Sequence, residues 1–230
     1  MTFQLETQML APAKRWLEGR GLRTKHEFPT PWGICDLVGL SFKESNVRRR
    51  LRYGQTKPLG PAHRIALLMQ IPPRSAGSYI TLQRLQREFW DLLSPVMVAT
   101  ELERLLAWNF ICSPRKNAFQ KVDGWRPLHD RIVAVELKLS RIEEVLSQAR
   151  SHVTFADESF VGLPQAVAER LVLGKRVEDF RSAGVGVLSV HHKRCEVLLP
   201  SKPRRREINP VLQQHCVERF WRTRLTGSSA

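Results

Sequence analysis

The chain has 230 residues, of which 42% are hydrophobic, and its 37 Lys and Arg against 22 Asp and Glu give a formal net charge of +15. A chain of this length and hydrophobicity can bury a core, which excludes wholesale disorder and favours one domain with an insertion or two small domains. The positive charge favours a polyanionic partner, most often nucleic acid, and no apolar run approaches the roughly 18–20 residues that would span a membrane.

The N-terminal residues 3–18 are predicted to form an amphipathic helix. The apolar stripe follows 3-and-4 spacing and comprises Met9, Leu10, Ala13, Trp16 and Leu17. Pro12 is expected to bend or break this helix, and Glu6 falls on or beside the apolar stripe, an unusual place for a carboxylate. The segment MTFQLETQML lacks the basic start and apolar core of a signal peptide, so we expect a cytoplasmic protein.

Two strands are expected next, TKHEF at 24–28 and GICDLVGLSF at 33–42, separated by the turn-forming PTPW. Ile34, Leu37, Val38 and Leu40 mark the second strand as buried. Asp36 lies in the middle of that strand. Since an unpaired carboxylate is costly to bury, Asp36 is a candidate site residue.

The composition changes over residues 45–126, which carry 14 Lys and Arg against 5 Asp and Glu. Helices are predicted at 61–71, 81–90 and 94–110, with a short extended piece at 78–80 and two more around a basic turn at 111–122. Thr81 and Ser94 are the expected N-caps of the second and third of these helices, and Pro95 takes the first helical position.

This order of helix, short strand, helix, helix and hairpin resembles a winged helix-turn-helix over residues 62–125. The resemblance implies an inserted DNA-binding domain at 45–127, in which Arg115 and Lys116 at the wing tip, with Arg84 and Arg87, contact nucleic acid. A helical insertion that only packs is the alternative. Acidic Glu101 and Glu103 on the third helix argue against sequence reading in a groove.

After this segment, strands are predicted at 131–140, 158–164, 184–190 and 195–201, and helices at 141–152 and 164–173. A basic stretch with RRR at 204–206 then leads to an amphipathic helix that ends near Phe220. The four cysteines are scattered without a C-x-x-C pair, so neither a zinc knuckle nor a disulfide framework is indicated. HHKRC at 191–195 is interpreted as ordinary turn residues, because no second ligand pair stands at a suitable spacing.

Glu136 and Lys138 lie two residues apart in the strand RIVAVELKLS. In an extended strand this spacing puts both side chains on one face, roughly 6 to 7 Å apart. Taken alone, such a pair is explained by a salt bridge on a solvated face. The alternative is that the pair forms half of a metal-dependent nuclease site, which would require further residues elsewhere in the chain.

Those residues occur in order. Asp36 on one strand, Glu136 and Lys138 on the next, Gln148 on the following helix and Glu6 on the first helix resemble the PD-(D/E)xK nuclease superfamily, which has the restriction-endonuclease-like fold. The resemblance covers residues 1–44 and about 128–192. It departs from the family pattern at Cys35, which replaces the proline, at His152, where some relatives have tyrosine, and in the long gap from Asp36 to Glu136.

The resemblance implies an α/β fold with a central mixed sheet flanked by helices, formed by residues 1–44 and 128–230. It also implies a Mg²⁺ or Mn²⁺ ion held by Asp36 and Glu136, with the carbonyl of Leu137 and the carboxylate of Glu6 as further ligands. Lys138 would orient and help deprotonate the attacking water, with a pKa lowered by burial beside the metal, and Gln148 would position water or phosphate.

The function expected from these residues is divalent-metal-dependent hydrolysis of DNA, by an endonuclease gripping duplex or branched DNA. A non-catalytic nucleic-acid-binding protein on the same fold, either a regulator or a subunit of a larger complex, is the alternative. An RNA-directed nuclease is a third possibility. A double-strand cutter would be expected to pair two sites in a homodimer.

Overall fold

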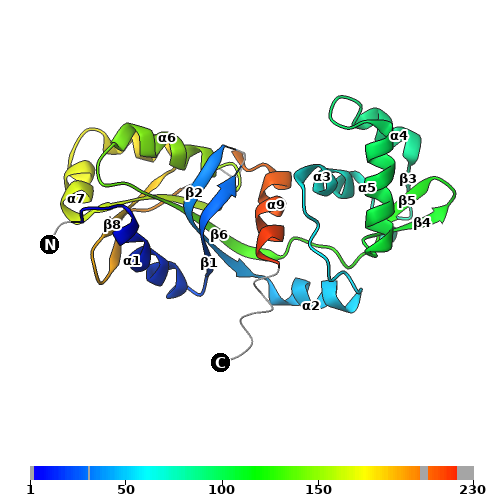
Figure 1. The fold of residues 1–230 in the computed structure, drawn as a ribbon, viewed down its shortest axis with the longest axis horizontal. Helices are drawn as coiled ribbons and strands as arrows, with labels where there is room; N and C mark the ends of the chain where they lie inside the picture. Colours follow the sequence, from blue (N-terminus) through cyan, green and yellow to red (C-terminus); the bar gives the residue numbers. More distant parts are fainter. Residues whose placement is uncertain (1–2, 31, 203–206, 222–230) are drawn as a thin grey trace. The chain divides into compact units, whose positions relative to one another are not determined.

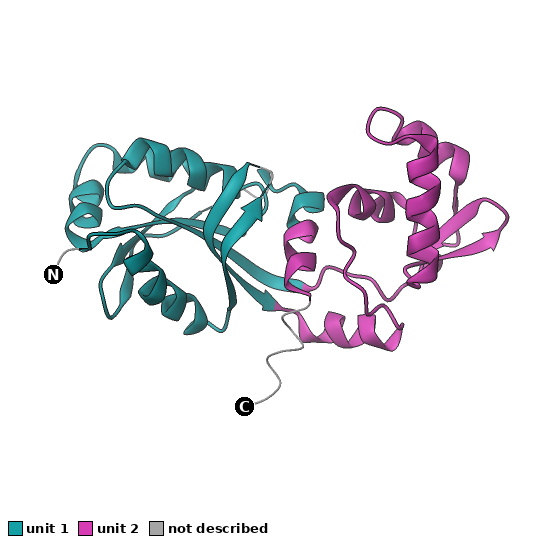
Figure 2. Ribbon diagram, in the orientation of Figure 1, with its two compact units in different colours: residues 1–41, 129–213 teal, residues 42–128, 214–230 magenta. Residues whose placement is uncertain are grey.

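A computed structural model describes residues 3–30, 32–202 and 207–221. The chain forms two compact units, the first comprising residues 1–41 and 129–213 and the second residues 42–128 and 214–230 (Figure 2). The expected boundaries were 44/45 and 127/128. Residues 214–221 differ from expectation, because they belong to the second unit and not to the first.

The first unit is built on a six-stranded mixed sheet in the order β1-β2-β6-β7-β8-β9 (Figure 1). The strands are β1 Arg23–Thr30, β2 Gly33–Phe42, β6 His129–Leu137, β7 Glu158–Pro164, β8 Gly186–Val190 and β9 Cys195–Leu199. β6, β7 and β8 run parallel, whereas β1 pairs antiparallel with β2 and β9 antiparallel with β8. The predicted α/β class with a mixed sheet is therefore confirmed.

Helices cover both faces of this sheet. They are α1 Thr7–Glu18, α6 Ile142–His152, α7 Gln165–Leu173 and α8 Val177–Ala183. The core beneath α1 contains Met9 and Leu17 together with Val135 of β6. A second core, beneath α6, α7 and α8, contains Ala149 and Val161. Alternate residues of the parallel strands thus enter different cores, as the period-2 pattern of a strand requires.

The first helix differs from its prediction at its start and at Pro12. It begins at Thr7, four residues later than expected. Before the helix, the backbone N–H groups of Gln4 and Leu5 donate to the side-chain Oε1 of Gln8 in its first turn. Pro12 lies inside the helix and is buried, so it does not break it. Burial of the helix against the sheet outweighs the penalty of roughly 3 kcal/mol for an interior proline.

The second unit contains α2, α3, α4 and α5 and a small antiparallel sheet in the order β3-β5-β4. Its elements are α2 Glu44–Arg52, α3 Ala62–Gln70, a 3₁₀ turn at Arg74–Ala76, β3 Ile80–Thr81, α4 Leu82–Glu88, α5 Pro95–Ala107, β4 Ile111–Arg115 and β5 Ala118–Lys121. Both predicted N-caps are confirmed, since Thr81 accepts from Arg84 N and Ser94 accepts from Met97 N.

The sequence did not predict α2 or α8, and the three arginines at 48–50 entered the sequence analysis only through the charge of residues 45–126. Arg50 of α2 is in fact fully buried and forms an ion pair with Glu218 at 2.5 Å. Glu218 belongs to α9 Pro210–Phe220, and the Arg50 guanidinium also lies 3.9 Å from the ring of Trp221. These contacts explain why residues 214–221 belong to the second unit.

Glu101 on α5 has a structural role that the sequence did not reveal. It is buried, forms an ion pair with Arg64 and accepts a hydrogen bond from Arg104 at 2.7 Å. Burial raises the pKa of Glu101, but the hydrogen bond and charge of Arg64 outweigh this and hold the pKa below its ordinary value. Glu101 therefore gives no information on whether α5 enters a DNA groove, whereas Glu103 is exposed.

The first four residues of HHKRC form the turn between β8 and β9, and Cys195 begins β9. The backbone N–H of His191 donates to the carbonyl of Arg194 in this turn. Within the part of the chain that the structure describes, none of the helices has the length and apolarity needed to cross a membrane. The basic run at 204–206 lies outside the described residues.

Replacing Glu218 with Gln should destabilise the second unit by roughly 3–5 kcal/mol, because Arg50 would remain buried without a compensating charge. Urea denaturation measures this. Glu178→Gln is the matched control, since Glu178 pairs with Arg181 on the surface, and its loss should cost less than about 1 kcal/mol. Equal effects of the two variants would contradict a stabilising role for the buried pair.

Candidate metal and phosphodiester site

Polar residues from four separated segments meet in the first unit, where β2 lies beside β6 in the sheet. Asp36 belongs to β2 and Glu136 to β6, and the N–H of Leu137 donates to Asp36 Oδ2 at 2.7 Å. Leu137 thus contacts Asp36 through its amide N–H. That the carbonyl of Leu137 binds a metal ion stays a prediction. The structure brings the two strands with the predicted carboxylates side by side.

Glu136 is the most deeply buried of these carboxylates, with 2% of its surface exposed. Its Oε1 atom accepts no hydrogen bond from any described residue. Burial, followed by the charge and the hydrogen-bonding contact of Asp36, raises the pKa of Glu136 to about 8, against smaller lowering by Lys138 and Cys35. Glu136 thus adjoins a second carboxylate in a setting that disfavours its charged form.

Lys138 lies one residue beyond the end of β6, so it does not continue the strand as expected. Its ammonium forms an ion pair with Glu6 at 3.2 Å and lies 4.0 Å from Glu144. Burial lowers the pKa of Lys138, but the hydrogen bond and charge of Glu6, with the charges of Asp36 and Glu144, raise it above its ordinary value. The lowering expected for a lysine buried beside a metal stays a prediction for the metal-bound protein.

Glu6 lies immediately before α1, and its second oxygen accepts from the backbone N–H of Leu139 at 3.4 Å. Its contacts are with Lys138 and Leu139. Glu6 is therefore placed to position Lys138, and its role as a metal ligand stays a prediction.

Gln148 of α6 lines a pocket of about 280 Å³ together with Glu136. Gln148 Oε1 is buried and accepts no hydrogen bond among the described residues. Trp32 and Ile34 also line this pocket and are largely exposed. The pocket therefore connects the buried carboxylate of Glu136 with the surface.

Cys35 and His152 are close to Glu136, and the sequence marked them only as departures from a family pattern. His152 Nε2 lies 3.3 Å from Glu136 Oε1, and ligand atoms of Cys35, Glu136 and His152 all lie within 4.8 Å of one another. Burial lowers the pKa of His152 to about 4 and, with the nearby carboxylates, raises the pKa of the Cys35 thiol well above its ordinary value. No spacing in the sequence could reveal this trio, because its members lie on three separate elements.

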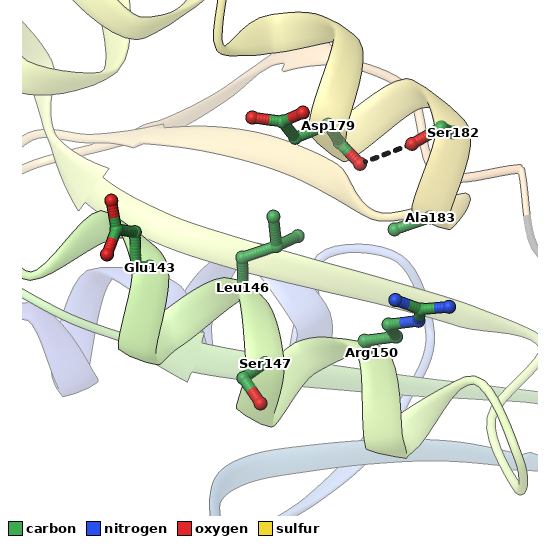
Figure 3. Close-up of a pocket in the computed structure, with 7 residues that line it drawn as sticks. All are labelled: Glu143, Leu146, Ser147, Arg150, Asp179, Ser182 and Ala183. Atoms are coloured by element: carbon green, nitrogen blue, oxygen red, sulfur yellow. Dashed lines mark hydrogen bonds between the residues drawn. The ribbon is translucent and has the colours of Figure 1, made fainter.

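A second pocket lies between α6 and α8 and contains none of the predicted site residues (Figure 3). Leu146 points from α6 toward α8, with the carboxylates of Glu143 and Asp179 at one end and Arg150 at the other (Figure 3). Ser182 donates to the backbone carbonyl of Asp179. The residues that line this pocket carry charges of both signs and do not form a recognisable reactive group.

The predicted nucleic-acid contacts Arg84, Arg87, Arg115 and Lys116 are all exposed in the second unit. The guanidinium of Arg115 lies 3.9 Å from the centre of the Tyr79 ring, and Arg84 pairs with Glu88 at 2.8 Å. The N–H of Leu82 at the start of α4 donates to the carbonyl of Asn117, which lies in the β4–β5 turn. The start of α4 and the tip of the hairpin therefore adjoin each other.

Glu136→Gln should remove a pH dependence of stability from the metal-free protein. Because the pKa of Glu136 is raised to about 8 in the folded state, its stabilising contribution is full below the unfolded pKa and is lost as pH rises toward 8. The wild type should therefore lose up to about 1.4 kcal/mol per pH unit relative to the variant between about pH 5 and 8. Urea denaturation in EDTA measures the difference.

The control for this experiment is Glu143→Gln on α6, whose side chain is exposed and pairs with Arg176 at the surface. Its stability should follow that of the wild type at every pH. If the curves of stability against pH are parallel for Glu136→Gln and the wild type, the pKa of Glu136 is not raised in the folded state.

Comparison with known proteins identifies no family for this chain. No protein-family model matches it, and no curated protein matches it. Among solved structures it is similar to a protein of unknown function from Silicibacter pomeroyi, with 10% sequence identity, a TM-score of 0.46, and coverage of 98% of this chain and 90% of that chain.

Proposed function

We propose that the chain is a divalent-metal-dependent nuclease that hydrolyses phosphodiester bonds in DNA. The observation that carries this proposal is the meeting of Asp36 and the buried, incompletely hydrogen-bonded Glu136 beside Lys138. A carboxylate whose pKa is raised by burial and by an adjacent carboxylate is typical of functional sites.

The residues present fit a hard divalent cation. Glu136 has a buried oxygen that accepts no hydrogen bond within the described part of the chain, and Asp36 adds a second carboxylate from the adjacent strand. We propose that these two hold Mg²⁺ or Mn²⁺, with the carbonyl of Leu137 and the carboxylate of Glu6 as further ligands. When bound, such an ion neutralises charge on the scissile phosphate and lowers the pKa of water.

Lys138 is proposed to orient the attacking water and to stabilise the negative charge that develops on the phosphate. The raised pKa of Lys138 keeps its ammonium cationic, which suits charge stabilisation better than proton abstraction. Glu6 then acts as a positioning residue through its ion pair with Lys138. Gln148, a neutral donor in the same pocket as Glu136, would position water or a phosphate oxygen.

The fold supports this proposal in its element order. We propose that the first unit has the restriction-endonuclease-like architecture, with Asp36 on β2 and the Glu-x-Lys pair at the end of β6. We propose that the second unit is a winged helix-turn-helix, since α3, α4 and α5 are followed by the β4–β5 hairpin and β3 joins its sheet. An insertion between β2 and β6 leaves the order of the core elements intact.

The second unit is proposed to grip DNA through its exposed basic residues. Arg84 and Arg87 lie on α4, and Arg115 and Lys116 lie at the hairpin whose turn contacts the start of that helix. Basic side chains of this kind contact phosphates, and they supply affinity without sequence discrimination.

A non-catalytic nucleic-acid-binding protein is the second candidate. It is favoured by the engagement of Lys138 with Glu6 and Glu144, which leaves its ammonium paired in the absence of a substrate. In this case the protein would keep the carboxylates but would bind nucleic acid without cleaving it.

Glu136→Ala and Lys138→Ala should each lower DNA cleavage by about 10²–10³-fold, since each removes charge stabilisation or orientation of the reacting groups. Linear, nicked, branched and single-stranded DNA, with RNA for comparison, would be incubated with Mg²⁺, Mn²⁺ or EDTA. Lys175→Ala, which removes an exposed charge on the same unit, is the control. Absence of cleavage with any ion, or full activity in both variants, would refute the nuclease proposal.

Replacing both Arg115 and Lys116 with Ala should weaken DNA binding equally on unrelated sequences. The slope of log affinity against log salt should become shallower by about 1.8, because about 0.9 is lost for each phosphate contact. Fluorescence anisotropy at several salt concentrations measures this, with the exposed Arg181→Ala as control. A loss of affinity confined to particular sequences, or an unchanged slope, would show that the hairpin does not contact DNA phosphates.

A further inference from the structure

Cys35, Glu136 and His152 form a buried group of sulfur, oxygen and nitrogen donors beside the proposed Mg²⁺ ligands. One ligand atom from each lies within 4.8 Å of the other two. Their exposed fractions are 0%, 2% and 3%. Such a group combines a thiol, a carboxylate and an imidazole, which are the usual protein ligands of zinc.

Three separate elements hold these side chains in place. Cys35 is on β2, and its Sγ donates to the carbonyls of Leu37 at 3.5 Å and Val135 at 3.7 Å, so it lies between β2 and β6. Glu136 is on β6, and His152 is the last residue of α6. Because all three elements are packed into the first unit, the donors are brought together before any ion binds.

The contact between Glu136 and His152 has the separation that a shared metal ion requires. Glu136 Oε1 and His152 Nε2 are 3.3 Å apart, yet Oε1 accepts no hydrogen bond among the described residues. In a tetrahedral zinc site with Zn–N and Zn–O bonds of about 2.0–2.1 Å, the nitrogen and oxygen ligands lie about 3.3 Å apart. A buried oxygen that faces an imidazole nitrogen at this distance, without a hydrogen bond among the described residues, is suited to share a cation with that nitrogen.

An ion can reach Glu136 and His152 from the surface. Glu136 and His152 both line the pocket of about 280 Å³ that opens beside Trp32 and Ile34, and Cys35 lies buried. Gln148 Oε1, in the same pocket, also accepts no hydrogen bond within the described part of the chain. A water or this amide oxygen can complete a four-ligand shell.

We propose that Cys35, Glu136 and His152 form a binding site for Zn²⁺ or a similar borderline transition metal. Thiolate and imidazole ligands select such ions over Mg²⁺, which prefers oxygen. Binding transfers the Cys35 thiol proton to solvent and forms a sulfur–metal bond, without oxidation or reduction.

The metal site has a consequence for the proposed nuclease, and only this consequence rests on the proposed function. Glu136 cannot serve a transition metal with Cys35 and His152 and a hard ion with Asp36 in the same geometry. Zn²⁺ should therefore inhibit Mg²⁺-dependent cleavage.

The site is tested by titrating metal-free, reduced full-length protein with Co²⁺ and recording its absorption. A thiolate–Co²⁺ charge-transfer band in the near ultraviolet is expected, saturating at about one ion per chain. Cys35→Ala should abolish the band, and His152→Gln should weaken Co²⁺ and Zn²⁺ affinity by more than about tenfold. Cys112→Ala, which removes a partly exposed cysteine of the second unit, should leave the spectrum unchanged.

The absorption experiment does not depend on cleavage, so it separates failure of the metal site from failure of the nuclease proposal. If Cys35→Ala does not fold by circular dichroism, Cys35→Ser and His152→Gln provide the same test, since a serine hydroxyl gives no thiolate band. Absence of the band in the wild type, or its persistence without the Cys35 thiol, would overturn the proposed site.

Discussion

The pairing of β2 with β6 is the interaction on which the candidate site depends. It joins segments about 100 residues apart in sequence, through the Leu137 N–H to Asp36 and the Cys35 thiol to the carbonyl of Val135. A shift of one residue in this pairing would turn alternate side chains to the opposite face of the sheet and separate the two carboxylates. Residues 42–128, the larger part of the second unit, lie between these two strands in the sequence.

The two units differ in the neighbours of their buried charged groups. In the second unit, Arg50 with Glu218 and Arg64 with Glu101 place opposite charges in contact, so each buried ion is compensated. In the first unit, Glu136 is buried beside another carboxylate, and its Oε1 accepts no hydrogen bond from the residues that the structure describes. This contrast supports a ligand-binding role for the first unit.

Glu136 lies between two sets of donors of different chemical character. Asp36 offers oxygen from one side, whereas Cys35 and His152 offer sulfur and nitrogen. Under the two proposals, a hard ion would use the oxygen donors, and a borderline ion would use the thiolate and imidazole. Glu136 would then be shared between the proposed catalytic metal site and the proposed transition-metal site.

The sequence by itself determined the strands of the six-stranded sheet, the helix caps at Thr81 and Ser94, and the residues Asp36, Glu136 and Lys138 as candidates, since alternation, turns and caps are local signals. It did not determine α2 or α8, because ESNVRRRLR offers few apolar positions and α8 is only 7 residues long. Only the tertiary structure decided that Arg50 is buried, that Lys138 pairs with Glu6, and that Cys35 and His152 meet Glu136. Those contacts join distant segments through strand pairing and helix packing, which no local pattern of residues encodes.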